Sequence, residues 1–540
     1  MDTADYIIVG AGAAGCVLAS RLTEDAGTEV LLLEAGGSDR GLLIAMPAAI
    51  PFVYQNKALN WGEQAGPEPW LDGLMIDEKR GRVVGGSTSI NAMIFNRGNP
   101  RDFDGWRDQG LPGWGWGDVL PYFRKMETFA EGANETRGGD GPLQISRAPA
   151  RHPLFDVYMR SGEQAGYPRP ADHNSGEQEG MHIAQVLIGK GRRCSASDAY
   201  LKPAQNRRNL HLRTGAHVAR ILFHGDRAVG VELTNGETLM AGKEVIVAAS
   251  TVGAAKLLLL SGVGPADELR QLGLPVVLDQ PNVGRNLENH PGVNLQYAAR
   301  REDTLVAELG LIGQARLGLE WLLFRRGLGA SNFFEAGAFL KTHDGADYAN
   351  LQLEFLPLAR RVVNGKVKVF PGFQLWMDLS RPTSRGYVRL RSADPHAAPE
   401  IVFNHMQTEA DRKDLIRSVR LARDLFSQPA WEGIRGEEVS PGASAQTDAE
   451  ILDWAKRAIG TSYHPSGTCR MSASPADGVV DACGLVHGLS GLRIVCTAIM
   501  PRVTTGNLSA PTYMIAEKLA DAIRGRAPFQ SQGRPAAKEQ

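Results

Sequence analysis

The pattern that most constrains this chain is a glycine-rich turn near its N-terminus, set between an apolar run and a helical stretch. Residues 6–33 have the order strand, turn, helix and strand, with Gly10, Gly12 and Gly15 in the turn. Both strand segments are continuously apolar, which is typical of a parallel sheet covered by helices on both faces. The sequence therefore predicts a βαβ unit that opens a doubly wound α/β fold.

In that context each glycine has a separate task. Gly10 permits the tight turn, Gly12 lets the backbone approach a pyrophosphate, and Gly15 allows the helix to pack closely. The helix N-terminus presents unpaired N–H groups to the anion. Glu34 ends the second strand, where a carboxylate can accept hydrogen bonds from a ribose hydroxyl. We expect a dinucleotide here, and this motif alone leaves NAD and FAD both open.

Size and composition exclude several classes of protein. The 540 residues exceed the roughly 250–300 at which one hydrophobic core stops growing, so two lobes are expected. The net charge is -1, and the 59 basic and 60 acidic residues are well mixed along the chain, so nucleic acid is not expected as a partner. The five cysteines are dispersed and suit a reducing compartment. Cys483 and His487 are too few for a structural zinc site, so no metal is expected.

The predicted location is the cytoplasm. Residues 1–4 are too short for an export signal, and the longest apolar stretch, 42–54, is interrupted by prolines and is shorter than the roughly 20 residues of a spanning helix. Residues 311–324 predict an amphipathic helix. Such a helix most commonly faces the core. A membrane-touching helix is the alternative, so peripheral contact with the inner membrane face stays open.

Three further segments carry a family resemblance. They are Gly81–Asn91 (GRVVGGSTSIN), Ser250–Gly264, and a C-terminal pair in which Tyr463–Cys469 is followed by Thr505–Asn507. With the N-terminal unit they resemble the glucose-methanol-choline (GMC) oxidoreductase family, and nearly the whole chain looks closest to its choline dehydrogenase branch.

The chain departs from the family pattern at two places. Ala254 and Ala255 stand where relatives usually have a Ser-Pro or Thr-Pro pair, and Cys496 and Thr497 stand where they usually have Asp-Ala.

The resemblance implies FAD as the cofactor. Gly85 and Gly86 supply backbone without side chains that can lie against an isoalloxazine ring, while Ser87 and Asn91 offer hydrogen bonds. Ile90 occupies the place where some relatives carry a flavin-linking histidine, which implies noncovalent FAD. The residues expected to contact the cofactor are Gly10, Gly12, Ala13, Ala14, Gly15, Glu34, Ala35, Trp61, Arg82, Val84, Gly86, Ser87, Asn91, Ala92, Met93, Val218, Thr497, Asn507 and Leu508.

The resemblance also implies the catalytic residues, His464 and Asn507. Oxidation of an alcohol requires removal of the hydroxyl proton as hydride leaves carbon for the flavin N5. Imidazole is the side chain whose ordinary pKa is nearest neutrality, so His464 is the expected general base. Asn507 is expected to orient the substrate oxygen. The predicted enzyme is an FAD-dependent alcohol dehydrogenase or oxidase that makes an aldehyde from a primary alcohol.

The substrate is less constrained. Choline is the first candidate, and Glu335 is the best local carboxylate for its cation. Against choline, Trp376 stands where choline-oxidising relatives carry a histidine, and Tyr463 can line a cavity for other alcohols. A quinone-type electron acceptor is favoured, with oxygen as the alternative. A non-redox lyase, a flavin-binding protein without turnover and a nicotinamide-dependent dehydrogenase are the competing interpretations, and the oligomeric state is not determined.

The expected architecture is a Rossmann-like FAD-binding domain with a second, substrate-binding domain built on an antiparallel sheet. The FAD-binding domain is assembled from discontinuous stretches. The expected ranges are 1–155, 193–300 and 460–527 for FAD binding, 156–192 and 301–459 for substrate binding, and 528–540 as a disordered tail.

Overall fold

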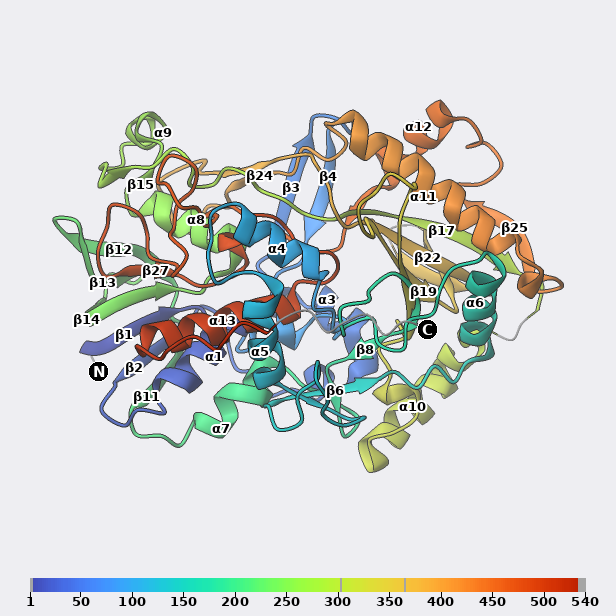
Figure 1. The fold of residues 1–540 in the computed structure, drawn as a ribbon, viewed down its shortest axis with the longest axis horizontal. Helices are drawn as coiled ribbons and strands as arrows, with labels where there is room; N and C mark the ends of the chain where they lie inside the picture. The colour runs from blue at the N-terminus through green and yellow to red at the C-terminus, as the bar shows by residue number, and fades with distance from the viewer. Residues whose placement is uncertain (1–2, 302–303, 364–365, 533–540) are drawn as a thin grey trace.

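The computed structural model describes residues 3–301, 304–363 and 366–532 of the chain. Over those residues two seven-stranded sheets dominate the fold. One lies at the left of Figure 1 and the other at the right, so the molecule has two lobes. The predicted fold class is confirmed: the architecture is mixed α/β, with one sheet that is largely parallel and one that is antiparallel.

The first sheet begins with the predicted βαβ unit. β1 (Thr3–Val9) pairs in parallel with β2 (Val30–Glu34), and helix α1 (Ala13–Leu22) connects them. All five residues of β2 are buried, as expected for a strand covered on both faces. The sheet order is β11-β2-β1-β14-β13-β12, with β27 alongside β14. These strands are β11 (Leu210–Thr214), β12 (Val218–His224), β13 (Arg227–Leu233), β14 (Thr238–Val247) and β27 (Leu492–Ile494).

The second sheet is antiparallel throughout its main path, β25-β17-β22-β19-β18-β7. Because strand residues alternate between faces, this sheet can present one face to helices and the other to a cavity. Its strands are β7 (Gly180–Ile183), β17 (Pro291–Ala299), β18 (Ala336–Leu340), β19 (Leu351–Leu356), β22 (Gly372–Leu379), β25 (Arg435–Ser440) and β26 (Gly460–Thr461), the last beside β17.

Helices flank both sheets. α13 (Ser509–Ile523) packs against α1 beside the first sheet, while α6 (Pro153–Gln164), α11 (Glu409–Ser427) and α12 (Asp448–Ala458) lie near the second (Figure 1). One hydrophobic core cluster includes residues of both sheets, among them Ile7, Leu32, Val293 and Leu353. Other α-helices are α2 (Leu42–Ala45), α3 (Ile50–Gln55), α4 (Pro100–Asp108), α5 (Trp116–Met126), α7 (Lys202–Ala204), α8 (Ser250–Leu260) and α9 (Ala266–Gln271).

Short strands complete the described part. They form small two- or three-stranded sheets, apart from the two large ones. They are β3 (Glu63–Glu68), β4 (Leu74–Glu78), β5 (Glu127–Phe129), β6 (Leu143–Arg147), β8 (Gln185–Val186), β9 (Ile188–Gly189), β10 (Arg192–Arg193), β15 (Val263–Gly264), β16 (Leu278–Asp279), β20 (Ala359–Val363), β21 (Lys366–Phe370), β23 (Tyr387–Arg389) and β24 (Glu400–Val402).

Helix α10 (Leu311–Phe324) forms where the sequence predicts a helix, but the expectation that it faces the core is wrong. Leu311 is 88% exposed and Ile312 is 87% exposed, and Trp321 is the helix's buried residue. Apolar residues occur around most of the helix, so packing one stripe leaves the others uncovered. The helix lies at the lower right of Figure 1.

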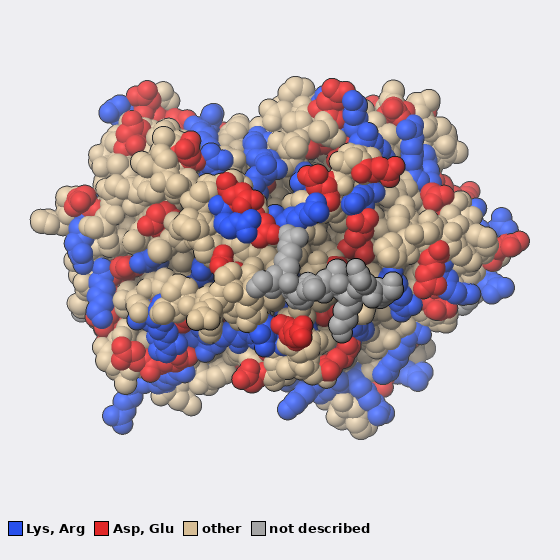
Figure 2. All heavy atoms as spheres, viewed as in Figure 1, with Lys and Arg blue, Asp and Glu red and all other residues tan. Residues whose placement is uncertain are grey.

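The end of the chain is partly attached to the first lobe. The Phe529 ring packs 4.9 Å from the Tyr122 ring, and the Gln532 N–H donates to the carbonyl of Gly117. The beginning of the predicted tail is therefore held against α5, and residues 533–540 lie outside the described residues. Among the residues that the structure describes, no helix is long and apolar enough to cross a membrane. On the face in Figure 2, basic and acidic side chains are interspersed.

Candidate active site

A cavity of about 1320 Å³ extends between the two lobes. It is lined by Gly12 and Glu34 of the first sheet's βαβ unit and by Glu354 and Trp376 of the second sheet. Ligand sites for single drug-sized molecules are typically about 300–1,000 Å³. The cavity is therefore large enough for a dinucleotide cofactor together with a small substrate.

The glycines of the N-terminal motif differ in how closely other atoms pack around them. A Cβ at Gly15 would lie 1.9 Å from the Gly10 carbonyl oxygen, so this glycine serves the packing of α1. A Cβ at Gly12 would meet no described protein atom closer than the Gly86 Cα at 4.0 Å. The cavity side of Gly12 is thus open, which fits the close approach of a pyrophosphate.

The second glycine segment meets the first at this point. Gly86 has a φ of +54°, and a Cβ there would lie 2.7 Å from the Gly12 Cα. Gly85 donates its backbone N–H to the Ala11 carbonyl at 2.7 Å. The two segments are far apart in the sequence, but their backbones pack directly against each other at the cavity. Any larger residue at Gly86 would push them apart.

Glu34 ends β2 at the cavity. Its carboxylate accepts hydrogen bonds from the backbone N–H of Ala11 at 3.0 Å and of Gly36 at 2.8 Å. Burial raises the pKa of Glu34 to about 7, and these two N–H donors oppose that shift. Each carboxylate oxygen retains acceptor capacity that suits a ribose hydroxyl.

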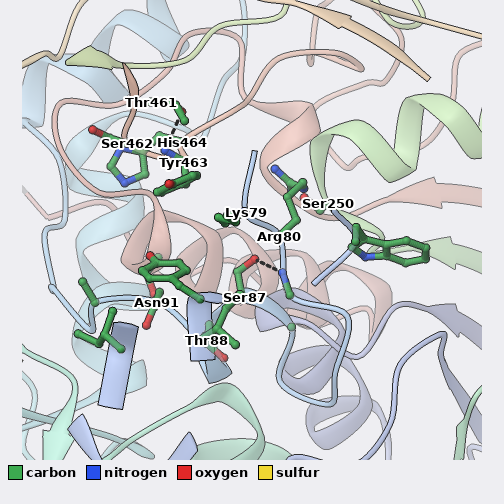
Figure 3. A pocket seen from close by; sticks show the side chains of 18 of the residues that line it. Lys79, Arg80, Ser87, Thr88, Asn91, Ser250, Thr461, Ser462, Tyr463 and His464 are labelled. Atoms are coloured by element: carbon green, nitrogen blue, oxygen red, sulfur yellow. Dashed lines mark hydrogen bonds between the residues drawn. The ribbon is translucent and has the colours of Figure 1, made fainter. Parts of the chain in front are cut away.

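Figure 3 shows Ser87 and Asn91 on one side of the cavity and the segment Thr461–His464 on another. The Ser87 Oγ accepts the Gly81 N–H at 3.1 Å, and the Asn91 Oδ1 accepts from Arg193 at 2.9 Å. Hydrogen bonds to neighbouring backbone and side chains therefore fix the positions of these two polar groups.

Most residues predicted to contact the cofactor line this cavity. Gly15, Arg82 and Val84 do not: Gly15 packs on Gly10, the Arg82 guanidinium lies 5.1 Å from the Trp61 ring centre, and Val84 is buried. The predicted residues that line the cavity are Gly10, Gly12, Ala13, Ala14, Glu34, Ala35, Trp61, Gly86, Ser87, Asn91, Ala92, Met93, Val218, Thr497, Asn507 and Leu508.

His464 and Asn507 come together in the cavity. The Asn507 Nδ2 lies 3.2 Å from the His464 Nε2, although the residues are 43 positions apart. Burial lowers the pKa of His464 well below its ordinary value, with the neighbouring His290 as a second cause. The ring is therefore neutral and able to take up a proton from a bound hydroxyl.

Two carboxylates beside this pair were not predicted from the sequence. Glu354 on β19 lines the cavity, accepts a hydrogen bond from Gln352 at 3.1 Å and interacts with the Asn507 side chain. Burial raises its pKa to about 7. Burial, and then the charge of Glu354, raise the pKa of Asp378 on β22 well above its ordinary value. The available signal was an acid inside LQLEFL, a strand whose other residues are apolar except for Gln352.

Two of the three residues predicted to bind the substrate line the cavity, and one does not. Tyr463 and Trp376 line the cavity, and the Trp376 indole donates to Asp378 at 2.6 Å. Glu335 does not line it. Its carboxylate accepts the Ser331 hydroxyl at 2.6 Å and interacts with the backbone at Ala150, so the side chain points away from the cavity. Glu354, rather than Glu335, places a carboxylate in the cavity, beside Asn507.

Comparison with known proteins agrees with this geometry. A family model described as GMC oxidoreductase matches residues 4–292, and a second, C-terminal GMC oxidoreductase model matches residues 382–516. The chain belongs to the GMC oxidoreductase family. As a GMC oxidoreductase it is an FAD-dependent enzyme that acts on alcohols.

Curated relatives of this GMC oxidoreductase are similar along nearly the full length. Oxygen-dependent choline dehydrogenase from Brucella anthropi is 43% identical over 97% of this chain and 96% of the relative. The protein of the same name from Paraburkholderia phymatum is 45% identical over 97% of this chain and 93% of the relative.

Solved structures are also similar along nearly the full length of the chain. Pyridoxine 4-oxidase from Mesorbium loti has a TM-score of 0.87 and 30% identity, covering 97% of this chain and 100% of that one. A variant of formate oxidase from Aspergillus oryzae, studied for FAD modification, has a TM-score of 0.90 and 25% identity, covering 97% and 98%.

Proposed function

We propose that this GMC oxidoreductase converts a primary alcohol to an aldehyde, with His464 as general base and Asn507 as the group that orients the substrate oxygen. The observation that carries the proposal is the 3.2 Å approach of Asn507 Nδ2 to His464 Nε2 in a cavity that also reaches Gly12. FAD, when bound, supplies the acceptor for the hydride. Residues of the glycine turn, Glu34, Ser87 and Asn91 would hold it.

His464 would take the hydroxyl proton at Nε2, the nitrogen that faces Asn507. An amide N–H from Asn507 would hold the alcohol oxygen and fix the direction of the carbinol carbon. Burial around the pair excludes water, which keeps the base neutral and strengthens the hydrogen bonds in the site. Positioned proton transfer is typically worth about 10² to 10⁴ in rate.

An alcohol panel under anaerobic conditions tests this function. The visible absorption band of the flavin should bleach with at least one primary alcohol, and His464→Ala should slow bleaching by about 10²-fold or more while flavin stays bound. A lyase would turn over substrate without net bleaching, and a binding protein would show no response to any alcohol. A nicotinamide enzyme would lack the flavin spectrum. Any of these results would contradict the proposal.

We also propose that FAD is bound noncovalently. Ile90 lines the cavity, and an isoleucine side chain has no nucleophile that could link to the flavin. Acid precipitation of the protein should therefore release the flavin into the supernatant. Yellow colour that stays in the pellet would contradict noncovalent binding.

Choline or a similar cationic alcohol is a candidate substrate. The relatives named choline dehydrogenase support it, and so does the Glu354 carboxylate in the cavity. The electron acceptor is proposed to be of the quinone type. Oxygen is the second candidate, favoured by the relatives named oxygen-dependent. Faster turnover with a quinone analogue than with oxygen supports the first, and rapid peroxide formation without it supports the second.

Contact between α10 and the cytoplasmic face of a membrane is proposed as well. A cluster of cations lies at the C-terminal end of this apolar helix: the Arg325 guanidinium is 4.0 Å from the Trp321 ring centre, and the Trp321 indole donates to Gly191 between exposed Lys190 and Arg192. Apolar side chains beside basic ones suit a surface of anionic lipids.

A further inference from the structure

A second imidazole lies behind His464. The Nδ1 atoms of His290 and His464 are 3.0 Å apart, and the two rings meet edge to face at 80°. His290 precedes β17 and is completely buried. Burial lowers its pKa to about 3, against an opposing interaction with the Ser380 backbone, so both rings are neutral. Two neutral rings this close form a hydrogen bond in which one Nδ1 must donate and the other accept.

The direction of that hydrogen bond follows from the other side of His464. The Asn507 Oδ1 accepts from the Asn96 Nδ2 at 2.7 Å and from the Gln352 Nε2 at 2.9 Å. Two donors on one atom identify it as the amide oxygen, so the other atom is the NH₂ group. That group lies 3.2 Å from the His464 Nε2 and can only donate to it.

The proton of the neutral His464 ring is therefore on Nδ1. Its Nε2 carries the lone pair, on the side that faces Asn507 and the cavity. The Nδ1–H donates to His290, which must accept through its own Nδ1 and carry its proton on Nε2. The hydrogen-bond pattern from Asn96 through Asn507 and His464 to His290 is thus consistent in one direction.

We infer that His290 is a positioning residue for the reaction proposed above: it accepts the Nδ1–H of His464, holds that ring in the tautomer that can receive a proton at Nε2, and stabilises the imidazolium that forms. The inference rests on the proposed function, because the imidazolium arises only when His464 takes the alcohol proton. A hydrogen bond from a ring that becomes charged is stronger than one between neutral groups, so the interaction strengthens as the proton moves.

A matched pair of variants tests this role. Asparagine at position 290 offers an amide oxygen near the place of Nδ1, whereas leucine has similar size and no acceptor. His290→Leu should lower the limiting rate of flavin bleaching by about 10- to 10²-fold, with little change in the alcohol concentration that gives half of the maximal rate. His290→Asn should recover most of the loss. Melting temperature and flavin content of both variants control for folding.

A second readout does not require turnover. The ring ¹⁵N chemical shifts of His464, assigned by their loss in His464→Gln, should show a proton on Nδ1 in the unmodified protein and in His290→Asn, and a mixed or reversed tautomer in His290→Leu. An Nε2–H tautomer in the unmodified protein would overturn the inference. So would equal bleaching rates in the leucine and asparagine variants that retain flavin. Failure of every alcohol to bleach the unmodified protein would instead reject the proposed function, while the shifts would still decide the tautomer.

Discussion

Alanine substitutions at Gly12 and Gly15 separate cofactor binding from protein packing. The two positions are three residues apart, Gly12 at the N-cap of α1 and Gly15 within the helix, yet their surroundings differ. At Gly15 an added Cβ would lie 1.9 Å from the Gly10 oxygen, far inside normal contact, whereas at Gly12 the nearest protein atom is 4.0 Å away. Gly12 also has an ordinary φ of -79°, so alanine causes no backbone strain there.

The magnitudes follow from these contacts. Gly15→Ala forces backbone apart and should destabilise the protein by about 1–3 kcal/mol or more, with or without flavin. Gly12→Ala should leave the flavin-free protein unchanged or stabilise it slightly, because alanine restricts the unfolded chain. With FAD, the methyl group would enter the space of the pyrophosphate. A cost of about 1–3 kcal/mol corresponds to a roughly 5- to 150-fold increase in Kd.

The assay compares melting temperatures of the flavin-free proteins and FAD affinity by quenching of flavin fluorescence. We expect Gly12→Ala to bind FAD weakly and melt normally, and Gly15→Ala to melt early. If Gly12→Ala bound FAD as tightly as the unmodified protein, the pyrophosphate would not lie against this glycine. If its flavin-free form melted early, the space beside Gly12 would not be open as the structure has it.

Two further predictions concern a buried acid and an exposed helix. Burial raises the pKa of Glu354 from 4.5 to about 7. The contribution of Glu354 to stability is therefore greatest below pH 4.5 and is lost as the pH rises from there through about 7. Glu354→Gln should melt at a higher temperature than the unmodified protein at pH 8, and its melting temperature should depend less on pH. Equal melting curves would place the pKa near its ordinary value. Leu323→Gln on α10 should weaken sedimentation with vesicles of anionic phosphatidylglycerol by about tenfold, whereas Leu212→Gln on β11, an exposed leucine of the other lobe, should not. Three results would reject the proposed contact between α10 and a membrane. They are equal effects of the two substitutions, no vesicle binding by the unmodified protein, and a concentration-dependent dimer of the unmodified protein that Leu323→Gln abolishes.

The parts of the fold that could be predicted from the sequence are those that residues close together in the chain determine. The turn from Gly10 to Gly15 specifies strand, helix and close backbone contact within a few residues. His464 and Asn507 could be paired only through the family resemblance, because spacing alone gives no reason for two loops to meet. The structure brings their side chains together, and their catalytic role stays a proposal.

The features that could not be predicted depend on neighbours distant in sequence. Glu354 reaches the cavity because β19 pairs with β22, which sets the face of the strand on which an acid lies. Glu335 directly precedes β18, and its interaction with the distant backbone at Ala150 turns it away from the cavity. For α10, the apolar pattern indicates a helix but not what covers it. The role of His290 depends on a hydrogen-bond direction that is fixed three side chains away.

The order of strands in the first sheet has a consequence for biosynthesis. β1 pairs with β2, which is made shortly after it, and on its other side with β14, which in turn pairs with β27, so one side of the nascent N-terminal strand waits for partners made hundreds of residues later. At ~5–20 residues per second, roughly 25–100 s separate emergence of the first strand from that of the last. Asn507 follows later still. The cavity between the two lobes is therefore complete only near the end of translation, and a ribosome that stops early releases a chain with exposed apolar strands and an incomplete cavity wall.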